Sequence, residues 1–238
     1  MGRGPGRWWW RVGAGGAALL LALTAAACSD GGGDDGGETD GGDGGLADGG
    51  LADGEALVAA FDEAAGAAYA ELGGDREQHH TEGIVLRDDC FALDGAAASA
   101  IIEALGLDPE GAVVEDVFLQ GVPGESEFLY CTLSPADTER GIAFRAGTTS
   151  YDRDGLVDLA RQGDARGPIE ELEGEVPGLD PDEVLAIALN QGQTVAFSWV
   201  ADGFMVSVGY PTALADPDGG FAALSEAVSG VTRALAAS

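Results

Sequence analysis

The sequence has no lysine, only two histidines and only three cysteines, and these shortages exclude several classes of functional site. All 11 basic residues are arginines, against 42 acidic residues, and the formal net charge is −31. Proteins that bind nucleic acids or anionic membranes through charge need clustered positive side chains. Most metal clusters and redox centres need more His and Cys than this chain has. We therefore expect no nucleic-acid partner, no metal site and no cofactor.

The apolar run near the N-terminus is too short for an ordinary transmembrane helix. It covers residues 12–27, which is 16 residues rich in Ala and Gly, whereas a spanning helix needs about 20 mostly apolar residues. Arg3, Arg7 and Arg11 precede it. A basic start followed by an apolar stretch of this length is typical of a secretory signal peptide.

The residues that end this run resemble a bacterial lipobox, in which a cysteine is lipidated and becomes the mature N-terminus. Small residues directly precede Cys28, although Ala25 stands where leucine is usual. The resemblance implies that 1–27 is a lipoprotein signal peptide and that Cys28 carries the lipid. The alternative is an ordinary cleaved signal with an incidental cysteine. Several acyl chains anchor a protein stably, so we expect the chain on the outer face of the cytoplasmic membrane.

Residues 28–54 are predicted to form a disordered tether rich in Gly and Asp. Residues 29–54 hold 12 glycines and 8 acids with hardly an apolar side chain, so they cannot bury enough surface to offset chain entropy. Residues 55–238 are predicted to form a single domain that is monomeric. With 8 arginines and 34 acids this domain has a formal net charge of 8 − 34 = −26. Such a charge favours solubility and is compatible with a basic partner in the cell envelope.

Helical and alternating apolar patterns predict the elements of this domain. Asp94 is expected to cap one helix and Ser150 another. The predicted helices cover 55–72, 94–106, a segment starting at Ser150, and 221–235. The predicted strands cover 84–86, 112–120, 126–133, 141–147, 194–201 and 204–210.

The clearest local prediction is a hairpin in which Asp202-Gly203 joins 194–201 to 204–210. A two-residue turn there pairs Ala201 with Phe204. The same register sets the other pairs: Trp199 with Val206, Phe197 with Val208, and Val195 with Tyr210. All eight side chains then share one face, and a slip of one residue would mix the faces.

One segment gives two signals. Asp180 and Pro181 are typical of a helix start, yet 184–190 alternates like a strand, and strand is the preferred interpretation. The element order suggests two similar αβββ halves with a further helix at each end, although no residue-level repeat supports a duplication. We predict the α+β class, an antiparallel sheet packed by helices on one face, with one disulfide.

That disulfide is predicted between Cys90 and Cys131. With Cys28 used for lipid, these two remain as an even pair in an oxidising compartment. The bridge would close a loop of about 42 residues and contribute roughly 4 kcal/mol in the chain-entropy model. No CxxC motif or nearby base indicates a catalytic thiol.

The arrangement is similar to the two-cysteine secreted lipoproteins of unknown function that are common in high-GC Gram-positive bacteria. The shared pattern is a lipobox, a polar tether, Cys90 entering a helix that ends at Leu105-Gly106, and Cys131 in a following strand. The segment 176–180, Val-Pro-Gly-Leu-Asp followed by a hairpin, also fits, whereas Thr132 replaces the usual aromatic residue. The resemblance covers 17–30 and 85–210. It implies an extracytoplasmic α+β domain with no catalytic residues to assign.

Catalytic signals are otherwise weak. His79-His80 lies in a polar loop and lacks further His ligands, so an exposed loop is preferred over a weak metal site. There is no GxSxG motif, and Asp152-x-Asp154-Gly155 is too short for a calcium loop. The face bearing Trp199 is expected to be packed core, with an apolar ligand cavity as the alternative.

Three functions follow, in order of preference. The first is a non-enzymatic, lipid-anchored binding or interaction domain for an envelope partner. The second is a carrier of a small apolar ligand or lipid, with its cavity between the Trp199 face and the C-terminal helix. The third is a glycan hydrolase that uses two carboxylates.

Overall fold

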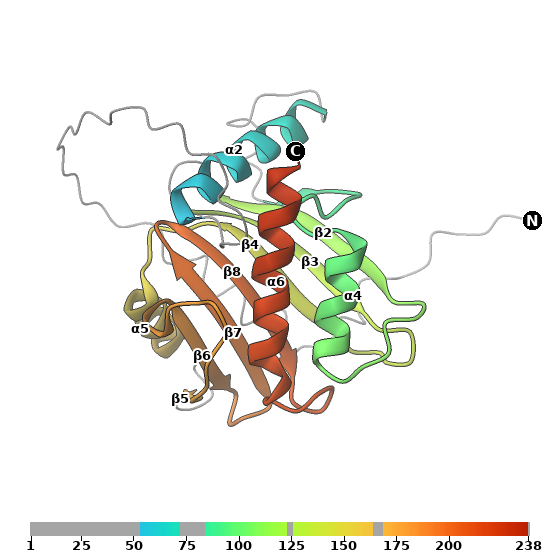
Figure 1. Cartoon of the computed structure of the whole chain (residues 1–238), viewed down its shortest axis with the longest axis vertical. Coiled ribbons are helices and arrows are strands. Elements are labelled where there is room, and N and C mark those ends of the chain that lie inside the picture. Colours follow the sequence, from blue (N-terminus) through green and yellow to red (C-terminus); the bar gives the residue numbers. More distant parts are fainter. Residues whose placement is uncertain (1–52, 72–83, 123–125, 164–168, 238) are drawn as a thin grey trace, which may run out of the picture.

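The computed structural model describes residues 53–71, 84–122, 126–163 and 169–237, which form an antiparallel sheet packed by helices (Figure 1). The helices are α2 (Gly54–Glu71), α4 (Gly95–Ala104), α5 (Arg153–Gly163) and α6 (Gly219–Ala236), and a 3₁₀ turn, η1, covers Pro181–Glu183. The strands are β1 (Ile84–Leu86), β2 (Val113–Val122), β3 (Ser126–Ser134), β4 (Ile142–Thr148), β5 (Glu170–Glu171), β6 (Val184–Leu189), β7 (Thr194–Ala201) and β8 (Phe204–Pro211).

The sheet contains eight strands in the order β1-β2-β3-β4-β8-β7-β6-β5. Every neighbouring pair is antiparallel. Two meanders, β2-β3-β4 and β6-β7-β8, meet where β4 pairs with β8, and the short strands β1 and β5 extend the two outer edges. This arrangement confirms the predicted α+β class.

Three helices, α2, α4 and α6, cover one face of the sheet and bury the larger of two apolar clusters (Figure 1). Phe61 of α2 lies edge-on to Phe204 of β8, with ring centroids 6.0 Å apart. Small residues bring α6 close to its neighbours, because a Cβ at Gly230 would lie 2.5 Å from the Cβ of Ala97 in α4. Helix α6 therefore packs against both the sheet and α4.

The expectation that all helices share one face is wrong, because α5 lies against the other face. Leu156 and Val157 of α5 join a second apolar cluster with Leu185 and Ile187 of β6 and Met205 of β8. Every residue of β6 is buried. A strand that is apolar on both faces needs cover on both, and α5 supplies the second cover.

The predicted hairpin and its register are confirmed. Ala201 pairs with Phe204 and Trp199 with Val206 across the turn at Asp202-Gly203, and the other two predicted pairs are present as well. Asp202 and Gly203 both have positive φ, as a type I′ turn requires.

One of the two predicted helix caps is right and the other is wrong. Asp94 caps α4, since its side chain accepts from the amide of Ala97 at 2.7 Å. Helix α5 is capped by Asp152 in place of Ser150, because the Asp152 carboxylate accepts from Gly155 N at 2.8 Å. A carboxylate at this position satisfies a free amide of the first turn.

Both signals around residue 184 are real. The Asp180 side chain caps the 3₁₀ turn η1, with Pro181 at its start. The chain then enters β6 at Val184, as the preferred interpretation predicted. Among the described residues, no helix is both long and apolar enough to cross a bilayer.

Candidate functional site

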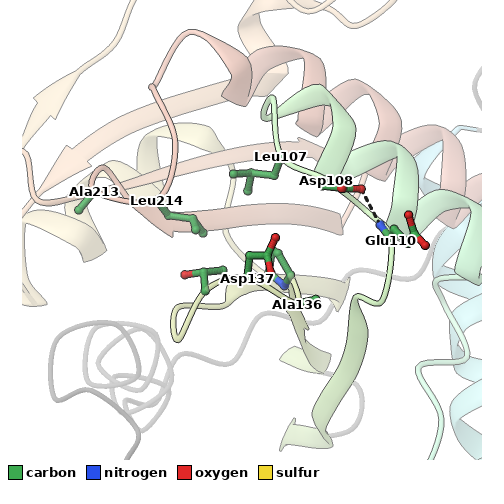
Figure 2. A pocket seen from close by; sticks show the side chains of 9 residues that line it. Leu107, Asp108, Glu110, Ala136, Asp137, Ala213 and Leu214 are labelled. Atoms are coloured by element: carbon green, nitrogen blue, oxygen red, sulfur yellow. Dashed lines mark hydrogen bonds between the residues drawn. The ribbon is translucent and has the colours of Figure 1, made fainter.

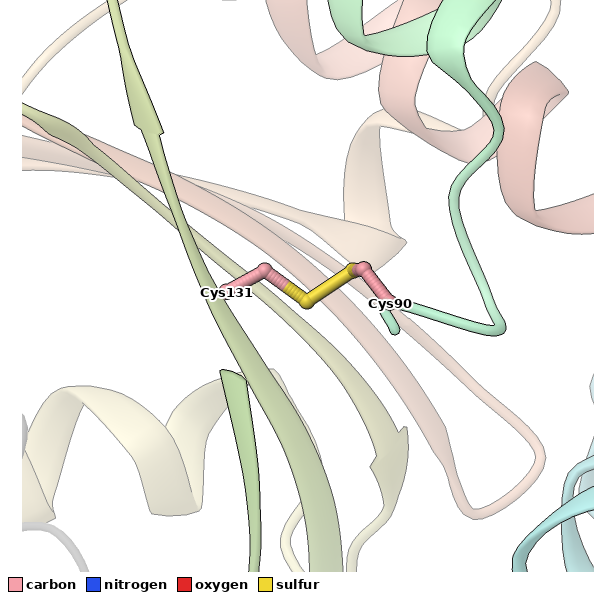
Figure 3. The surroundings of a disulfide bond; sticks show 2 residues. All are labelled: Cys90 and Cys131. Atoms are coloured by element: carbon pink, nitrogen blue, oxygen red, sulfur yellow. A yellow bond between two sulfur atoms is a disulfide. The ribbon is translucent and has the colours of Figure 1, made fainter. Parts of the chain in front are cut away.

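The sequence-predicted site residues divide into those inside and those outside the described ranges. Cys28, the expected lipidation site, lies outside them, and so do His79 and His80. Cys90 and Cys131 are joined by a disulfide with their Cα atoms 6.2 Å apart (Figure 3). The predicted disulfide is therefore confirmed.

The disulfide fastens the segment before α4 to β3, an interior strand of the sheet. Cys131 is fully buried in β3 and belongs to the main apolar cluster. Arg87 holds the start of the same segment, because its guanidinium donates to the Ala68 carbonyl at 2.8 Å and contacts Glu71 at 3.0 Å. These contacts tie α2, the linking segment and β3 into one unit, which is a structural role.

The face bearing Trp199 is packed core, as the preferred interpretation stated. Trp199, Phe197 and Tyr210 are 3%, 0% and 1% exposed. A Cβ at Gly220 of α6 would overlap the ring of Phe197, so the helix already lies as close as it can. Trp199 Nε1 also donates to the Glu183 carboxylate at 2.9 Å. The side chains fill the space where the carrier hypothesis placed a cavity.

An open pocket of about 270 Å³ lies where the α4–β2 loop, the β3–β4 loop and the loop after β8 meet (Figure 2). Its lining includes Leu107 and Leu214 together with the carboxylates of Asp108, Glu110 and Asp137. The Asp108 carboxylate accepts from the Glu110 amide at 2.9 Å, which is a local turn contact. The pocket is therefore one more part of the acidic surface.

The buried carboxylate among the described residues makes a structural contact. Glu127 is the one fully buried acid among the described residues, and it accepts a hydrogen bond from the Tyr69 hydroxyl at 2.8 Å. That contact joins α2 to β3. Within the described ranges no group of three or more His, Cys, Asp or Glu side chains could hold a metal ion.

The most unusual polar group lies on the other face of the sheet. Arg145 of β4 pairs with Tyr130 of β3 on one side and with Ser207 of β8 on the other. Continued across the sheet, this register forms a single row of opposed residues. The row, from edge to edge, is Leu86, Phe118, Tyr130, Arg145, Ser207, Ser198 and Leu185.

Arg145 is only 4% exposed and its guanidinium carbon lies 4.5 Å from the centroid of the Phe128 ring. Among the described residues, no carboxylate lies within salt-bridge distance of its guanidinium. Burial lowers the pKa of this guanidinium to about 10, which still leaves it charged at neutral pH. A buried cation without an anion is costly.

The groups beside Arg145 are polar on one side and aromatic on the other. The Ser198 and Ser207 hydroxyls lie 3.0 Å apart in a buried hydrogen bond. Tyr130 stacks on Phe118 with ring centroids 4.6 Å apart, and burial raises the pKa of its hydroxyl. We take this row as the candidate functional site.

Sequence reasoning missed the row, although one signal was present. Strand β4 reads Ile-Ala-Phe-Arg-Ala-Gly-Thr, with a single arginine in an otherwise apolar run. The comparisons add no assignment, because no family model, no curated protein and no solved structure matches the chain.

Proposed function

We propose that the chain is a lipid-anchored binding or interaction domain outside the cytoplasmic membrane, and that it does not catalyse a reaction. Residues 1–27 serve as the signal peptide, Cys28 carries the lipid, 28–54 form the tether, and 55–238 bind a partner at the cell envelope. The observation that carries this proposal is the disulfide between Cys90 and Cys131. Structural disulfides persist in oxidising compartments, which agrees with export.

The described chemistry favours binding over turnover. The buried acid Glu127 is held by Tyr69 in a contact between α2 and β3, so it is placed for stability. Arg145, in contrast, is a charged group that the described residues leave without an anion. The carrier hypothesis receives no such support, because Trp199 and its neighbours fill the intended cavity.

Metabolic labelling with a fatty-acid analogue tests the anchor. In a Gram-positive host, we expect the wild-type chain to be labelled and to sediment with membranes. Cys28→Ala should abolish both the label and the sedimentation, because no other residue offers the thiol that is lipidated. The matched control is the double variant Cys90→Ala/Cys131→Ala, which lacks the other two cysteines, keeps Cys28 and should keep the label.

The alternative gives a different result. If Cys28 were incidental to an ordinary cleaved signal, the wild-type chain would be released unlabelled into the medium, and Cys28→Ala would behave in the same way. Labelling that survives Cys28→Ala would also contradict the proposed anchor.

A further inference from the structure

The row of residues centred on Arg145 has the composition of a recognition site for an anion. The chain carries 42 acids and 11 arginines, yet none of the described acids pairs with Arg145. In contrast, Arg87, Arg153 and Arg161 each contact at least one carboxylate. Among the described arginines, the two others without a carboxylate partner, Arg140 and Arg233, are exposed, so Arg145 is the buried one that lacks a counter-charge.

The guanidinium of Arg145 is positioned rather than loose. Its guanidinium carbon lies over the Phe128 ring, 4.5 Å from the centroid, and this cation–π contact restrains it. Arg145 is 4% exposed. Its side-chain nitrogens are not among the fully buried polar atoms that lack a hydrogen-bond partner. The planar guanidinium presents parallel N–H groups that match a carboxylate or a phosphate.

The residues next to Arg145 on the same face of the sheet are small. The neighbouring residues on the same face pair across β3, β4, β8 and β7 in a second row. That second row is Thr132, Ala143, Gly209 and Ala196. All four residues are small and partly exposed, and the apolar cluster of α5 does not include Thr132, Ala143 or Gly209.

The other direction along the Arg145 row is apolar. From Arg145 the row passes over Tyr130 and Phe118, which are stacked and half-buried, to Leu86, which is 75% exposed at the sheet edge. Three interstrand steps separate Arg145 from Leu86, a distance of about 14 Å at the usual strand spacing. One cationic group and one apolar strip therefore lie in line.

We propose that this row binds a small amphiphile with a single anionic head group, a carboxylate or a phosphate ester. The head group pairs with Arg145, next to the Ser207 hydroxyl, and the apolar body lies over Tyr130 and Phe118 toward Leu86. The proposal names a ligand class for the proposed function. It rests on that function only because it assumes that the domain binds a ligand.

Isothermal titration of the purified full chain with decanoate, decyl phosphate and decanol, each below its micellar concentration, tests the site. We expect at least one of the two anions to bind with one-to-one stoichiometry, about ten- to a hundredfold more tightly than decanol, as a charge-assisted hydrogen bond implies. Comparing the two anions then identifies the head-group source. A carboxylate preference indicates a fatty-acid-like ligand, and a phosphate preference indicates a lipid phosphate.

Three variants locate the binding. Arg145→Met, which keeps an unbranched apolar stem but removes the guanidinium, should reduce the anion affinity to that of decanol. Arg233→Met is the matched control, because Arg233 is an exposed arginine of α6. Leu86→Ser, at an exposed position, should weaken decanoate binding a fewfold and leave the folding transition unchanged. Leu86→Ser also tests the site if Arg145→Met does not fold.

The proposal is overturned if both anions bind the wild-type chain no more tightly than decanol, or if Arg145→Met and Arg233→Met bind them alike. If the wild-type chain does not bind the anions but Cys28 is labelled, this site is rejected and the anchored binding domain is retained. If the chain binds the anions but Cys28 is not labelled, the anchor is rejected and this site is retained.

Discussion

Helix α5 offers a test of capping at the level of single residues. The Asp152 carboxylate accepts from the amide of Gly155, whereas Ser150 lies exposed before it. We expect Asp152→Ala to lower the free energy of unfolding by about 1 kcal/mol, as is typical for loss of an N-cap. Ser150→Ala should change it by less than about 0.5 kcal/mol. Urea unfolding of the two variants distinguishes these outcomes, and equal losses would contradict the assignment of the cap.

Tyr210 gives the fold a dependence on alkaline pH. Burial, followed by the nearby carboxylates of Asp216 and Asp218, raises the pKa of the Tyr210 hydroxyl, which donates to the Asp216 carbonyl at 3.0 Å. Above pH 10 the unfolded chain releases this proton while the folded chain retains it. The folded state then binds more protons, so the free energy of unfolding contributed by Tyr210 falls as the pH rises.

Tyr210→Phe should therefore flatten the alkaline fall in stability while costing about 1 kcal/mol at neutral pH for the lost hydrogen bond. Arg145 acts with the opposite sign, because its lowered pKa, about 10 against 12.5, makes the unfolded chain bind more protons in that range. The measurement is thus the difference in slope between variant and wild type in denaturant titrations from pH 9 upward. A Tyr210→Phe slope equal to that of the wild type would reject the argument.

Arg145 marks the limit of what single residues reveal in a sequence. An arginine in an apolar strand is visible in the printed chain, but its neighbours in space are not. Tyr130 and Ser207 lie beside it only because β3 and β8 flank β4, and the β4–β8 pairing joins strands that are distant in the chain. Such a contact depends on the strand order, which local patterns do not determine.

At the level of elements, two glycines in helices predict opposite effects of the same substitution. A Cβ at Gly66 in α2 would meet no atom within 4 Å, whereas a Cβ at Gly230 in α6 would meet that of Ala97 in α4. We expect Gly66→Ala to raise the free energy of unfolding by about 0.5–1 kcal/mol, because alanine favours the helix. Gly230→Ala should lower it by about 1–3 kcal/mol through overpacking.

Thermal unfolding of both variants checks the pair of helical glycines. Stabilisation by Gly230→Ala would mean that α4 and α6 are farther apart than described here. Destabilisation by Gly66→Ala would mean that the exposed side of α2 is covered by another part of the chain.

The elements that the sequence predicted correctly are those specified by local chemistry. The Asp202-Gly203 turn and the alternation around it determine one register, and the structure has that register. The face chosen by α5 was not predictable in this way. Its apolar residues show that it packs against another element but not which one. The strand that it covers, the fully buried β6, comes later in the chain, and the Asp180-Pro181 sequence before β6 is also compatible with a helix.

At the scale of the whole molecule, the two halves of the sheet are closed by very short edge strands. Strand β1 has three residues and β5 has two, and β5 consists of Glu170 and Glu171. Short or charged edges give another chain little to pair with. The described sheet edges therefore offer a second copy of the chain little to pair with, and the face opposite α2, α4 and α6 is the part of the sheet that is left for recognition.

The overall charge predicts how the molecule responds to salt. The formal net charge is −31, and repulsion among so many carboxylates opposes the compact state. Raising the ionic strength screens this repulsion over distances beyond the Debye length. The ion pairs of Arg87, Arg153 and Arg161 are weakened by the same screening, but they are far fewer than the unpaired acids.

We therefore expect the melting temperature at pH 7 to rise by several degrees between about 0.01 M and 0.5 M sodium chloride, where about 1 kcal/mol corresponds to about 2–4 °C in a chain of this size. Differential scanning calorimetry at the two salt concentrations measures the effect. The control is the same pair of scans near the isoelectric point of about 4.1, where the net charge and its repulsion vanish and salt should have little effect. A melting temperature that falls with salt at pH 7 would show that the few ion pairs outweigh the repulsion.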